Sequence, residues 1–349
     1  MNKTIIDRLL KSEEPSIRFK MRMNVFNENP HSPSMIALQQ EIKLSNRVQR
    51  LLSGRTEDGK LNPISNPYQK WHGAHWVLVH LAEMCFPKGD SSLLPLREQV
   101  YDYWLCEKMQ RLVECNSESE AARVNGVPVI QGKARRCASQ QGNALFSTLA
   151  LGIADHRAET IVSLLLKWQW PDGGWNCDKS PDAKVSSFYE SLIPLRALAL
   201  YSQSAQGAQS VPDGAIHSSI GKATEVFLTR RMFRGKRDGQ VINAEFLKLH
   251  YPCYWHYDIL FGLKVMSECG LIKDPRCEEA LNILESKELP DGGGWPAEGR
   301  YYQISAAEDA KPKPNSDKVS WGTNSKKCMN EWVTADALFV LSRAGRISV

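Results

Sequence analysis

The sequence predicts an all-α protein, an (α/α)6 double-ring toroid of inner and outer helices, and three observations lead to this fold class. Apolar residues recur at helical spacing in successive runs along the chain. Runs with one polar side alternate with runs that are apolar nearly all round, as is typical of an outer helix followed by a buried inner one. Gly-rich turns that end in Trp join the two kinds of run, and this unit repeats.

The composition fits one folded domain over residues 1–349. Hydrophobic residues make up 42% and charged residues 24% of the chain, and closed repeat architectures reach this length as one domain. The net charge of +5 is spread without a long basic run, so we expect no nucleic-acid partner. No window approaches about 18 apolar residues, which predicts no transmembrane segment. The first residues lack the apolar core of a signal peptide, which predicts a cytoplasmic location. Nine cysteines without a C-x-x-C motif predict reduced thiols.

The repeated turn is clearest at residues 168–175, which read Trp-Gln-Trp-Pro-Asp-Gly-Gly-Trp, and again at 289–295. Weaker copies occur at 56–61 and 236–241. Pro ends the first helix, Gly allows the chain to reverse, and Trp covers apolar surface between the two helices. We therefore expect each turn to connect an outer helix to an inner one.

The inner helices follow these turns, and the polar segments between them are expected to be connections. Residues 1–33 are expected to form a helical extension, and a helix over 34–52 is expected to pair with the last inner helix and close the ring. The connection 304–327 is expected to be a mobile loop, either a lid or a plain linker. The predicted inner helices cover residues 71–82, 137–152, 188–201, 254–266 and 332–344. The other predicted connections are 116–133 and 202–217.

The spacing of Gln169, Gly173, Gly174 and Trp175 resembles the repeat of squalene and oxidosqualene cyclases and of protein prenyltransferase β-subunits. The repeat can be followed over residues 50–345. The resemblance implies the toroid fold, a reaction in a central cavity and membership of a bacterial branch of that terpenoid cyclase and prenyltransferase superfamily. The motif is specific for the fold and says little about the chemistry.

The signature motifs of that superfamily's known activities are absent from the chain. There is no Asp-x-Asp-Asp string, which argues against a protonation-initiated cyclase of the squalene-hopene type. There is no Asp-x-Cys string, which the prenyltransferases resembled here use to hold zinc, and no Asp-Asp pair for an ionisation-type synthase.

The amino-terminal ends of the inner helices are the expected site. If these helices run in the same direction, their amino termini and the Gly-Gly-Trp turns gather at one rim, where the helix dipoles favour an anion. Polar and aromatic residues on otherwise apolar helices concentrate there. The residues predicted to bind substrate are His72, Trp76, Arg135, Arg136, Gln140, Trp255, Arg300 and Trp332.

One candidate chemistry is a metal site. Cys137, Cys177 and His256 fall at corresponding ends of three successive inner helices, and together with Asp178 or a water molecule they form a tetrahedral ligand set for zinc. Such an ion acts as a Lewis acid or activates water or a thiol. The alternative is that these cysteines are inert packing residues.

The other candidate chemistry is acid/base catalysis by His256 and Asp258, assisted by Glu190 and Tyr254. Carboxyl groups that enter an apolar cavity have raised pKa values, as a general acid requires, and aromatic rings stabilise a carbocation through their π faces. The alternative is that the two carboxylates pair with arginines as buried polar contacts.

These observations favour an enzyme that acts on an apolar, for example isoprenoid-like, small molecule as a transferase, lyase or isomerase. One alternative is a non-catalytic toroid that binds a peptide, a lipid or a helical partner subunit. The other is a carbohydrate-active enzyme on a similar helical barrel, which the Gly-Gly-Trp repeat disfavours.

Overall fold

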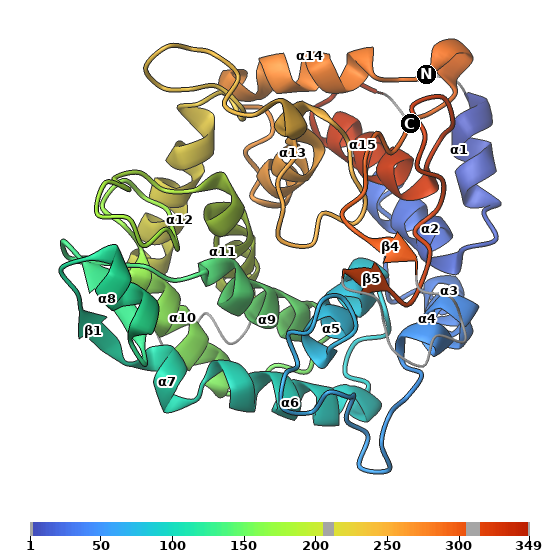
Figure 1. Cartoon of the computed structure of the whole chain (residues 1–349). Coiled ribbons are helices and arrows are strands. Elements are labelled where there is room, and N and C mark those ends of the chain that lie inside the picture. The colour runs from blue at the N-terminus through green and yellow to red at the C-terminus, as the bar shows by residue number, and fades with distance from the viewer. Residues whose placement is uncertain (1–2, 205–212, 305–314, 348–349) are drawn as a thin grey trace.

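The computed structural model describes residues 3–204, 213–304 and 315–347, and within them the chain is rich in helix and poor in strand. Figure 1 shows the helices arranged around a common centre. The all-α class predicted from the sequence is confirmed, because fifteen α-helices and five short strands make up the regular structure of the described residues.

Five helices lie toward the middle of Figure 1 and correspond to the predicted inner runs. They are α5 (Ala74–Glu83), α9 (Ala138–Ala150), α11 (Phe188–Ser202), α13 (Ile259–Glu268) and α15 (Glu331–Arg343). Helix α9 packs against α5 and α11, and α13 packs against α11 and α15. The run predicted from residue 254 becomes helical only at Ile259, because the preceding Asp258 is extended and caps the helix by accepting the Phe261 N–H at 2.8 Å.

A second set of helices lies at the periphery of Figure 1. It comprises α1 (Lys3–Leu10), α3 (Pro33–Leu44), α6 (Leu94–Trp104), α10 (Arg157–Trp168), α12 (Asp213–Leu228) and α14 (Glu278–Ser286). Shorter helices are α2 (Pro15–Lys20), α4 (Asn46–Leu51), α7 (Glu107–Gln110) and α8 (Glu118–Arg123), and a π-helical turn at Met21–Val25 extends α2. The helix predicted over 34–52 is two helices, because extended Ser45 interrupts it and caps α4 through the Val48 N–H.

Short strands occupy two segments that were predicted as connections. Strand β1 (Leu112–Glu114) pairs in parallel with β2 (Val127–Ile130), which pairs antiparallel with β3 (Lys133–Ala134). In the predicted mobile loop 304–327, residues 305–314 lie outside the described residues. Its flanks form a parallel pair, β4 (Gln303–Ile304) with β5 (Ser316–Asp317). Part of the predicted connection 202–217, residues 205–212, also lies outside them.

The Gly-Gly-Trp turns connect the peripheral and inner helices as the sequence predicts. The indole N–H of Trp175 donates to the Leu165 carbonyl at 2.9 Å, and that of Trp295 donates to the Leu284 carbonyl at 2.7 Å. A Cβ at Gly174 would lie 2.3 Å from the Ser191 hydroxyl oxygen, so only glycine fits there. The indole hydrogen bond therefore repeats in both turns and ties each turn back to the preceding helix.

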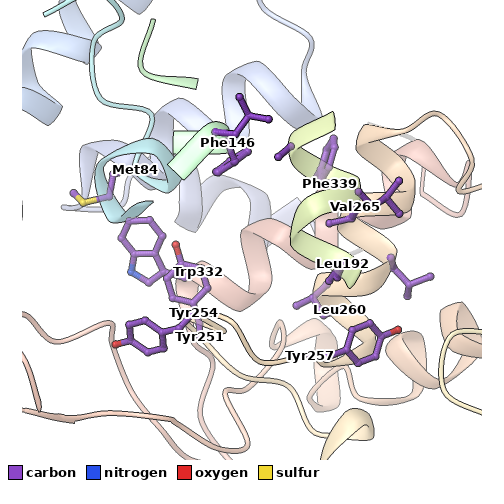
Figure 2. Packing of buried hydrophobic residues seen from close by; sticks show 14 of the residues in the cluster. Met84, Phe146, Leu192, Tyr251, Tyr254, Tyr257, Leu260, Val265, Trp332 and Phe339 are labelled. Carbon is purple, nitrogen blue, oxygen red and sulfur yellow. The ribbon is translucent and has the colours of Figure 1, made fainter. Parts of the chain in front are cut away.

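One continuous hydrophobic core fills the space between the helices, and Figure 2 shows the part that the inner helices share. Side chains from α11, α13 and α15 meet there with aromatic rings from the segment that leads into α13. No described helix has the length and apolar character needed to cross a lipid bilayer.

Candidate functional site

Cys137, Cys177 and Glu190 form a compact cluster at the amino-terminal ends of α9 and α11. One thiol sulfur from each cysteine and one carboxylate oxygen all lie within 4.8 Å of one another. Both cysteines are half-buried, and Glu190 is buried with 7% of its surface exposed. Two thiols and a carboxylate at these separations match the donor types and spacing of a metal-ligand set.

Local backbone pairing brings the two cysteines together. Arg135 and Asn176 form a parallel β-bridge, and the Arg136 N–H donates to the Asn176 carbonyl at 3.2 Å. The Arg135 guanidinium then holds the loop after Cys177 by donating to the carbonyls of Asp178 at 3.1 Å and Ala183 at 2.9 Å. Because the two segments run side by side, the residues that follow the bridge point toward the same space.

Packing of α9 against α11 supplies the third group. One oxygen of Glu190 accepts the backbone N–H of Ser139 at 3.1 Å and its hydroxyl at 2.8 Å. Glu190 therefore caps the first turn of α9 from the neighbouring helix, where the helix dipole favours a negative charge. The other oxygen faces the Cys177 thiol at 3.4 Å and is the one available to a ligand.

The three groups repel one another when they are charged. Burial raises the pKa of Glu190, and the hydrogen bonds from Ser139 oppose that rise only in part. The pKa of Cys177 is raised strongly, first by its hydrogen bond with Cys137, then by burial and by the nearby Glu190 carboxylate. Three anions this close require either shared protons or a cation.

Two basic side chains flank the cluster without an acidic partner. Within the described residues, no carboxylate lies within 4.0 Å of Lys70 or Arg136. The Lys70 ammonium lies 5.3 Å from the ring centre of Trp71 and 4.9 Å from that of Trp255. Burial lowers the pKa of both basic groups, and the charge of Cys137 opposes that effect in each. An anion is the natural missing partner.

His256 lies in a stack of aromatic rings beyond Lys70. Its ring is parallel to Tyr301 at 3.6 Å and to Trp255 at 3.8 Å. Its Nδ1 lies 3.0 Å from the Cys253 carbonyl oxygen, which can only accept, so Nδ1 carries the proton and Nε2 keeps its lone pair. Burial lowers the pKa of His256 to about 4, so the ring is neutral at pH 7.

The structure does not bring the predicted zinc ligands together as one set. Cys137 and Cys177 meet, but the third ligand in the cluster is Glu190, and His256 and Asp178 are not members of it. The Asp178 side chain is exposed and accepts the Ser180 N–H at 2.9 Å within its own loop. Metal-binding side chains thus meet at the predicted rim, but the set of ligands differs from the predicted one.

Two of the predicted catalytic residues have structural partners that account for them. Asp258 is fully buried, and its oxygens accept the backbone N–H groups of Phe261 at 2.8 Å and His250 at 2.7 Å. The Tyr254 hydroxyl donates to buried Asp317 at 2.6 Å. These contacts give Asp258 and Tyr254 a structural role in holding the segment that leads into α13, and their part in acid/base catalysis stays a prediction.

The remaining predicted binding residues divide between the rim and the core. The Gln140 side chain hydrogen-bonds the Tyr68 hydroxyl beside the cluster. His72 Nε2 lies 3.3 Å from the Ser316 hydroxyl, and the Arg300 guanidinium lies 5.8 Å from the ring centre of Tyr302. Trp76 and Trp332 are buried in the core, where Trp76 donates to the Tyr68 carbonyl at 3.1 Å and Trp332 stacks on Tyr251. Packing alone accounts for both indoles.

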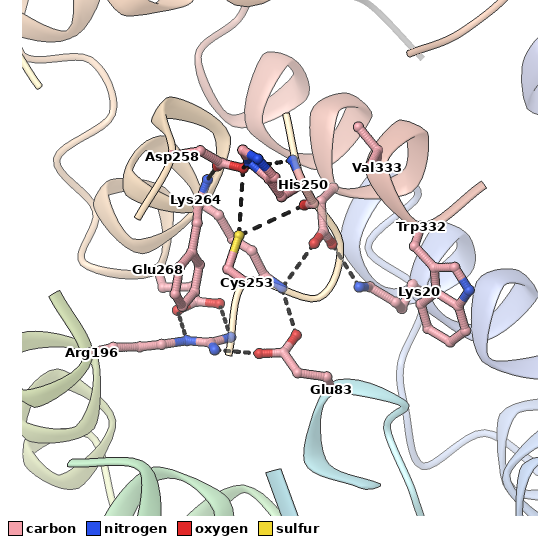
Figure 3. Close-up of polar contacts among 12 residues, drawn as sticks. Lys20, Glu83, Arg196, His250, Cys253, Asp258, Lys264, Glu268, Trp332 and Val333 are labelled. Atoms are coloured by element: carbon pink, nitrogen blue, oxygen red, sulfur yellow. Dashed lines mark hydrogen bonds and ion pairs between the residues drawn. The ribbon is translucent and has the colours of Figure 1, made fainter. Parts of the chain in front are cut away.

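The centre of the molecule holds a charged network that the sequence analysis missed. Figure 3 shows Arg196 between Glu268 and Glu83, and Lys264 in contact with Glu83. Lys264 also pairs with Asp336 at 3.1 Å, and Asp336 pairs with Lys20 at 2.6 Å. Three cations and three anions thus alternate and compensate one another.

The cavity beside this network is small, and it is lined by the charged side chains of the network together with apolar and aromatic ones. Its volume is about 40 Å³, room for about three water molecules. The signal that could have found it was present in the sequence: Arg196, Lys264 and Asp336 each stand as the lone charge in an otherwise apolar inner helix segment. A charge in such a place needs a buried partner.

The distant structural neighbours of this chain include two solved proteins. A protein from Actinoplanes is 17% identical with a TM-score of 0.43, over 95% of this chain and 90% of that chain. A variant of the type II terpene cyclase MstE from Scytonema, solved with geranylgeranyl dihydroxybenzoate, is 16% identical with a TM-score of 0.25, over 87% of this chain and 98% of that chain. No protein-family model and no curated protein matches the chain. Because both TM-scores are below 0.5, the function has to be argued from the site.

Proposed function

We propose that the chain is an enzyme that holds a zinc ion with Cys137, Cys177 and Glu190 and acts on a small anionic molecule at the rim around this cluster. One observation carries the proposal: three donor atoms of zinc-binding type lie within 4.8 Å of one another, beside basic groups that have no acidic partner in the part of the chain that the structure describes. This is the zinc-assisted form of the chemistry expected from the sequence, with Glu190 in place of His256 and Asp178.

The donor set fits zinc better than a harder cation. Two soft thiolates favour zinc over magnesium or calcium, and three protein ligands leave the fourth tetrahedral position open, as in catalytic zinc sites. A zinc ion in this position would act as a Lewis acid or lower the pKa of a bound water or thiol. Ser139 would orient Glu190 through the oxygen that faces away from the cysteines.

The charge balance favours an anionic substrate. Two thiolates and a carboxylate exceed the charge of a zinc ion by one, and the cations of Lys70 and Arg136 together outweigh that excess. The positive remainder attracts a phosphate, diphosphate or carboxylate group. The half-buried ring of Trp255, which already contacts the Lys70 ammonium, provides an apolar surface for the rest of the substrate, which suits an isoprenoid-like molecule.

His256 is the proton acceptor in this proposal. Its Nε2 lone pair is free of a proton at neutral pH because the pKa of the ring is lowered to about 4. The parallel rings of Tyr301 and Trp255 restrict its orientation. A neutral, oriented imidazole is suited to accept a proton from a substrate group held beside it.

The proposal includes the closed (α/α)6 toroid in a cytoplasmic protein. The successive packing of α5, α9, α11, α13 and α15 supports a ring, and α15 also packs against α2 and the π-helical turn, where the ring would close. A cytoplasmic location remains a prediction from the sequence. If the tests of the enzyme fail, the alternatives are a non-catalytic role and a helical partner subunit.

Metal analysis tests the proposal directly. We expect about one zinc per chain after purification without chelator, and loss of that zinc in Cys137→Ser, Cys177→Ser and Glu190→Gln. Cys269→Ser is the matched control, because this half-buried cysteine lies outside the cluster at the carboxyl end of α13. A zinc content near zero in the wild-type chain, or retention of zinc in Cys177→Ser, would overturn the metal site.

Ligand binding tests the substrate class separately. We expect farnesyl and geranylgeranyl diphosphate to raise the melting temperature of the zinc-loaded protein, and Lys70→Met to remove that shift while keeping the zinc. No shift with either diphosphate or with inorganic diphosphate would refute the anionic substrate. Recovery of a stoichiometric helical partner in its place would favour the non-catalytic role.

A further inference from the structure

The geometry that brings Cys137 and Cys177 together also suits a disulfide between them. Their sulfur atoms lie within 4.8 Å of each other, and the backbone bridge between Arg135 and Asn176 runs directly beside them. Bridged strands lie about 4.8 Å apart, whereas disulfides join Cα atoms about 4.4 to 6.8 Å apart. Rotation of the two side chains can therefore close the bond without separating the segments.

The surroundings of this pair differ from those of the other cysteines that make sulfur contacts. The Cys177 thiol lies within 4.8 Å of the Cys137 thiol and hydrogen-bonds the Glu190 carboxylate at 3.4 Å. By contrast, the thiols of Cys115 and Cys277 bond to backbone carbonyls, and that of Cys253 bonds to a carbonyl and to the Asp258 carboxylate. Both members of the pair are half-buried at the rim, so a small oxidant can reach them.

We infer that Cys137 and Cys177 are a redox-active dithiol that closes to a disulfide and, in doing so, removes both sulfur ligands from the proposed cation site. The first half of this inference stands on the geometry of the pair, whereas loss of the cation rests on the proposed function. Glu190 alone would then remain as a ligand, and a single carboxylate does not retain zinc.

The oxidant is a small-molecule disulfide such as oxidised glutathione. The thiolate of one cysteine attacks a sulfur of that disulfide, so that a mixed disulfide forms and one small thiolate leaves. The thiolate of the other cysteine then attacks the protein sulfur of the mixed disulfide, and the second small thiolate leaves. Two protein thiols are oxidised and one small disulfide is reduced to two thiols, which take up the two protons.

The experiment uses the full chain in a background in which the exposed Cys106 and Cys328 are changed to serine. Cys106 precedes α7 as its cap residue, where serine is well tolerated. The zinc-free and zinc-loaded proteins are titrated with glutathione redox buffers. Free thiols are then blocked, and non-reduced peptides are mapped by mass spectrometry. A chromogenic chelator follows zinc release, and circular dichroism confirms that the chain remains folded.

We expect a peptide pair linked through Cys137 and Cys177, with one zinc released for each bond formed, and full reversal by a dithiol reductant. Cys177→Ser should leave Cys137 as a stable mixed disulfide with glutathione, whereas Cys269→Ser should behave as the parent chain does. A folded parent chain that gives only mixed disulfides, or no oxidation of either cysteine, would overturn the inference. If the linked pair forms in a chain that never binds zinc, the dithiol is retained and the zinc proposal fails.

Discussion

The buried charge network allows the effect of one substitution on the free energy of unfolding to be estimated from the structure. We consider Glu83→Gln, which keeps the shape of the side chain and removes its charge. The Glu83 carboxylate contacts Arg196 through one oxygen and Lys264 at 2.7 Å through the other. These two cations hold the pKa of Glu83 well below its usual range against the effect of burial, so the carboxylate is ionised at neutral pH.

The expected loss follows from what the substitution leaves behind. Removing one partner of a buried ion pair costs about 3 to 5 kcal/mol, because the remaining charge is uncompensated. Lys264 keeps Asp336, and Arg196 keeps Glu268, so the network retains two anions against three cations. We therefore expect the free energy of unfolding to fall by about 3 kcal/mol, at the lower end of that range.

A double variant separates charge balance from simple loss of contacts. Glu83→Gln combined with Lys264→Met leaves two complete pairs, Lys20 with Asp336 and Arg196 with Glu268. The double variant should be more stable than the sum of the two single effects predicts by at least about 1 kcal/mol. Coupling of this sign arises only if the network acts as one charge-balanced unit.

Urea unfolding followed by Trp fluorescence and circular dichroism measures these changes. The matched control is Glu41→Gln, because Glu41 pairs with Arg18 at 2.7 Å but is 55% exposed. Surface pairs of this kind contribute about 0 to 1 kcal/mol. If Glu83→Gln costs no more than this control, or if the two network substitutions are additive, the reasoning about the centre of the molecule is refuted.

Three further predictions concern single residues. Burial lowers the pKa of His75 to about 3, below its unfolded value, so the unfolded state takes up the proton first. His75 should therefore account for about 2 kcal/mol of the stability lost from pH 7 to pH 5, and urea unfolding of His75→Asn should show a loss smaller by about that amount. Ser139→Ala removes one hydrogen bond to Glu190 and should weaken zinc binding about 10- to 100-fold in chelator competition, while Ser204→Ala, at a distant helix end, should not. Asp258→Ala removes a buried cap and should lower the free energy of unfolding by about 2 to 3 kcal/mol, whereas an unchanged denaturation midpoint would favour the predicted catalytic role of Asp258.

Local sequence information was sufficient for the helices and the turns. The Gly-Gly-Trp strings at residues 173–175 and 293–295 form the predicted turns, since glycine and tryptophan satisfy requirements set within a few residues. The run predicted to start at residue 254 is helical only from Ile259, because Asp258 caps the helix by accepting an N–H three residues later. Interactions between residues close in the sequence thus allowed most helix ends, and the residue types found at them, to be predicted.

The composition of the site depended on contacts between helices, which the sequence shows only indirectly. Cys137 and Cys177 were expected at the same rim because both follow repeat boundaries. Glu190 was assigned to acid/base catalysis. Its role as a cap on α9 could not be predicted from the sequence, because that role depends on how α9 packs against α11. His256 was placed with the cysteines because corresponding helix ends were expected to be neighbours, whereas the structure places it in a separate aromatic stack.

The balance of charges explains why the rim is the better candidate for chemistry than the centre. In the central network every cation has an anion within 4.0 Å, and the adjacent cavity holds only about three water molecules, so neither charge nor space is left for a substrate. At the rim, two thiols and a carboxylate face one another while Lys70 and Arg136 have no acidic partner among the described residues. A bound cation and an anionic ligand would compensate these charges. The helix dipoles at the rim favour an anion there, and the half-exposed side chains leave the site open to solvent.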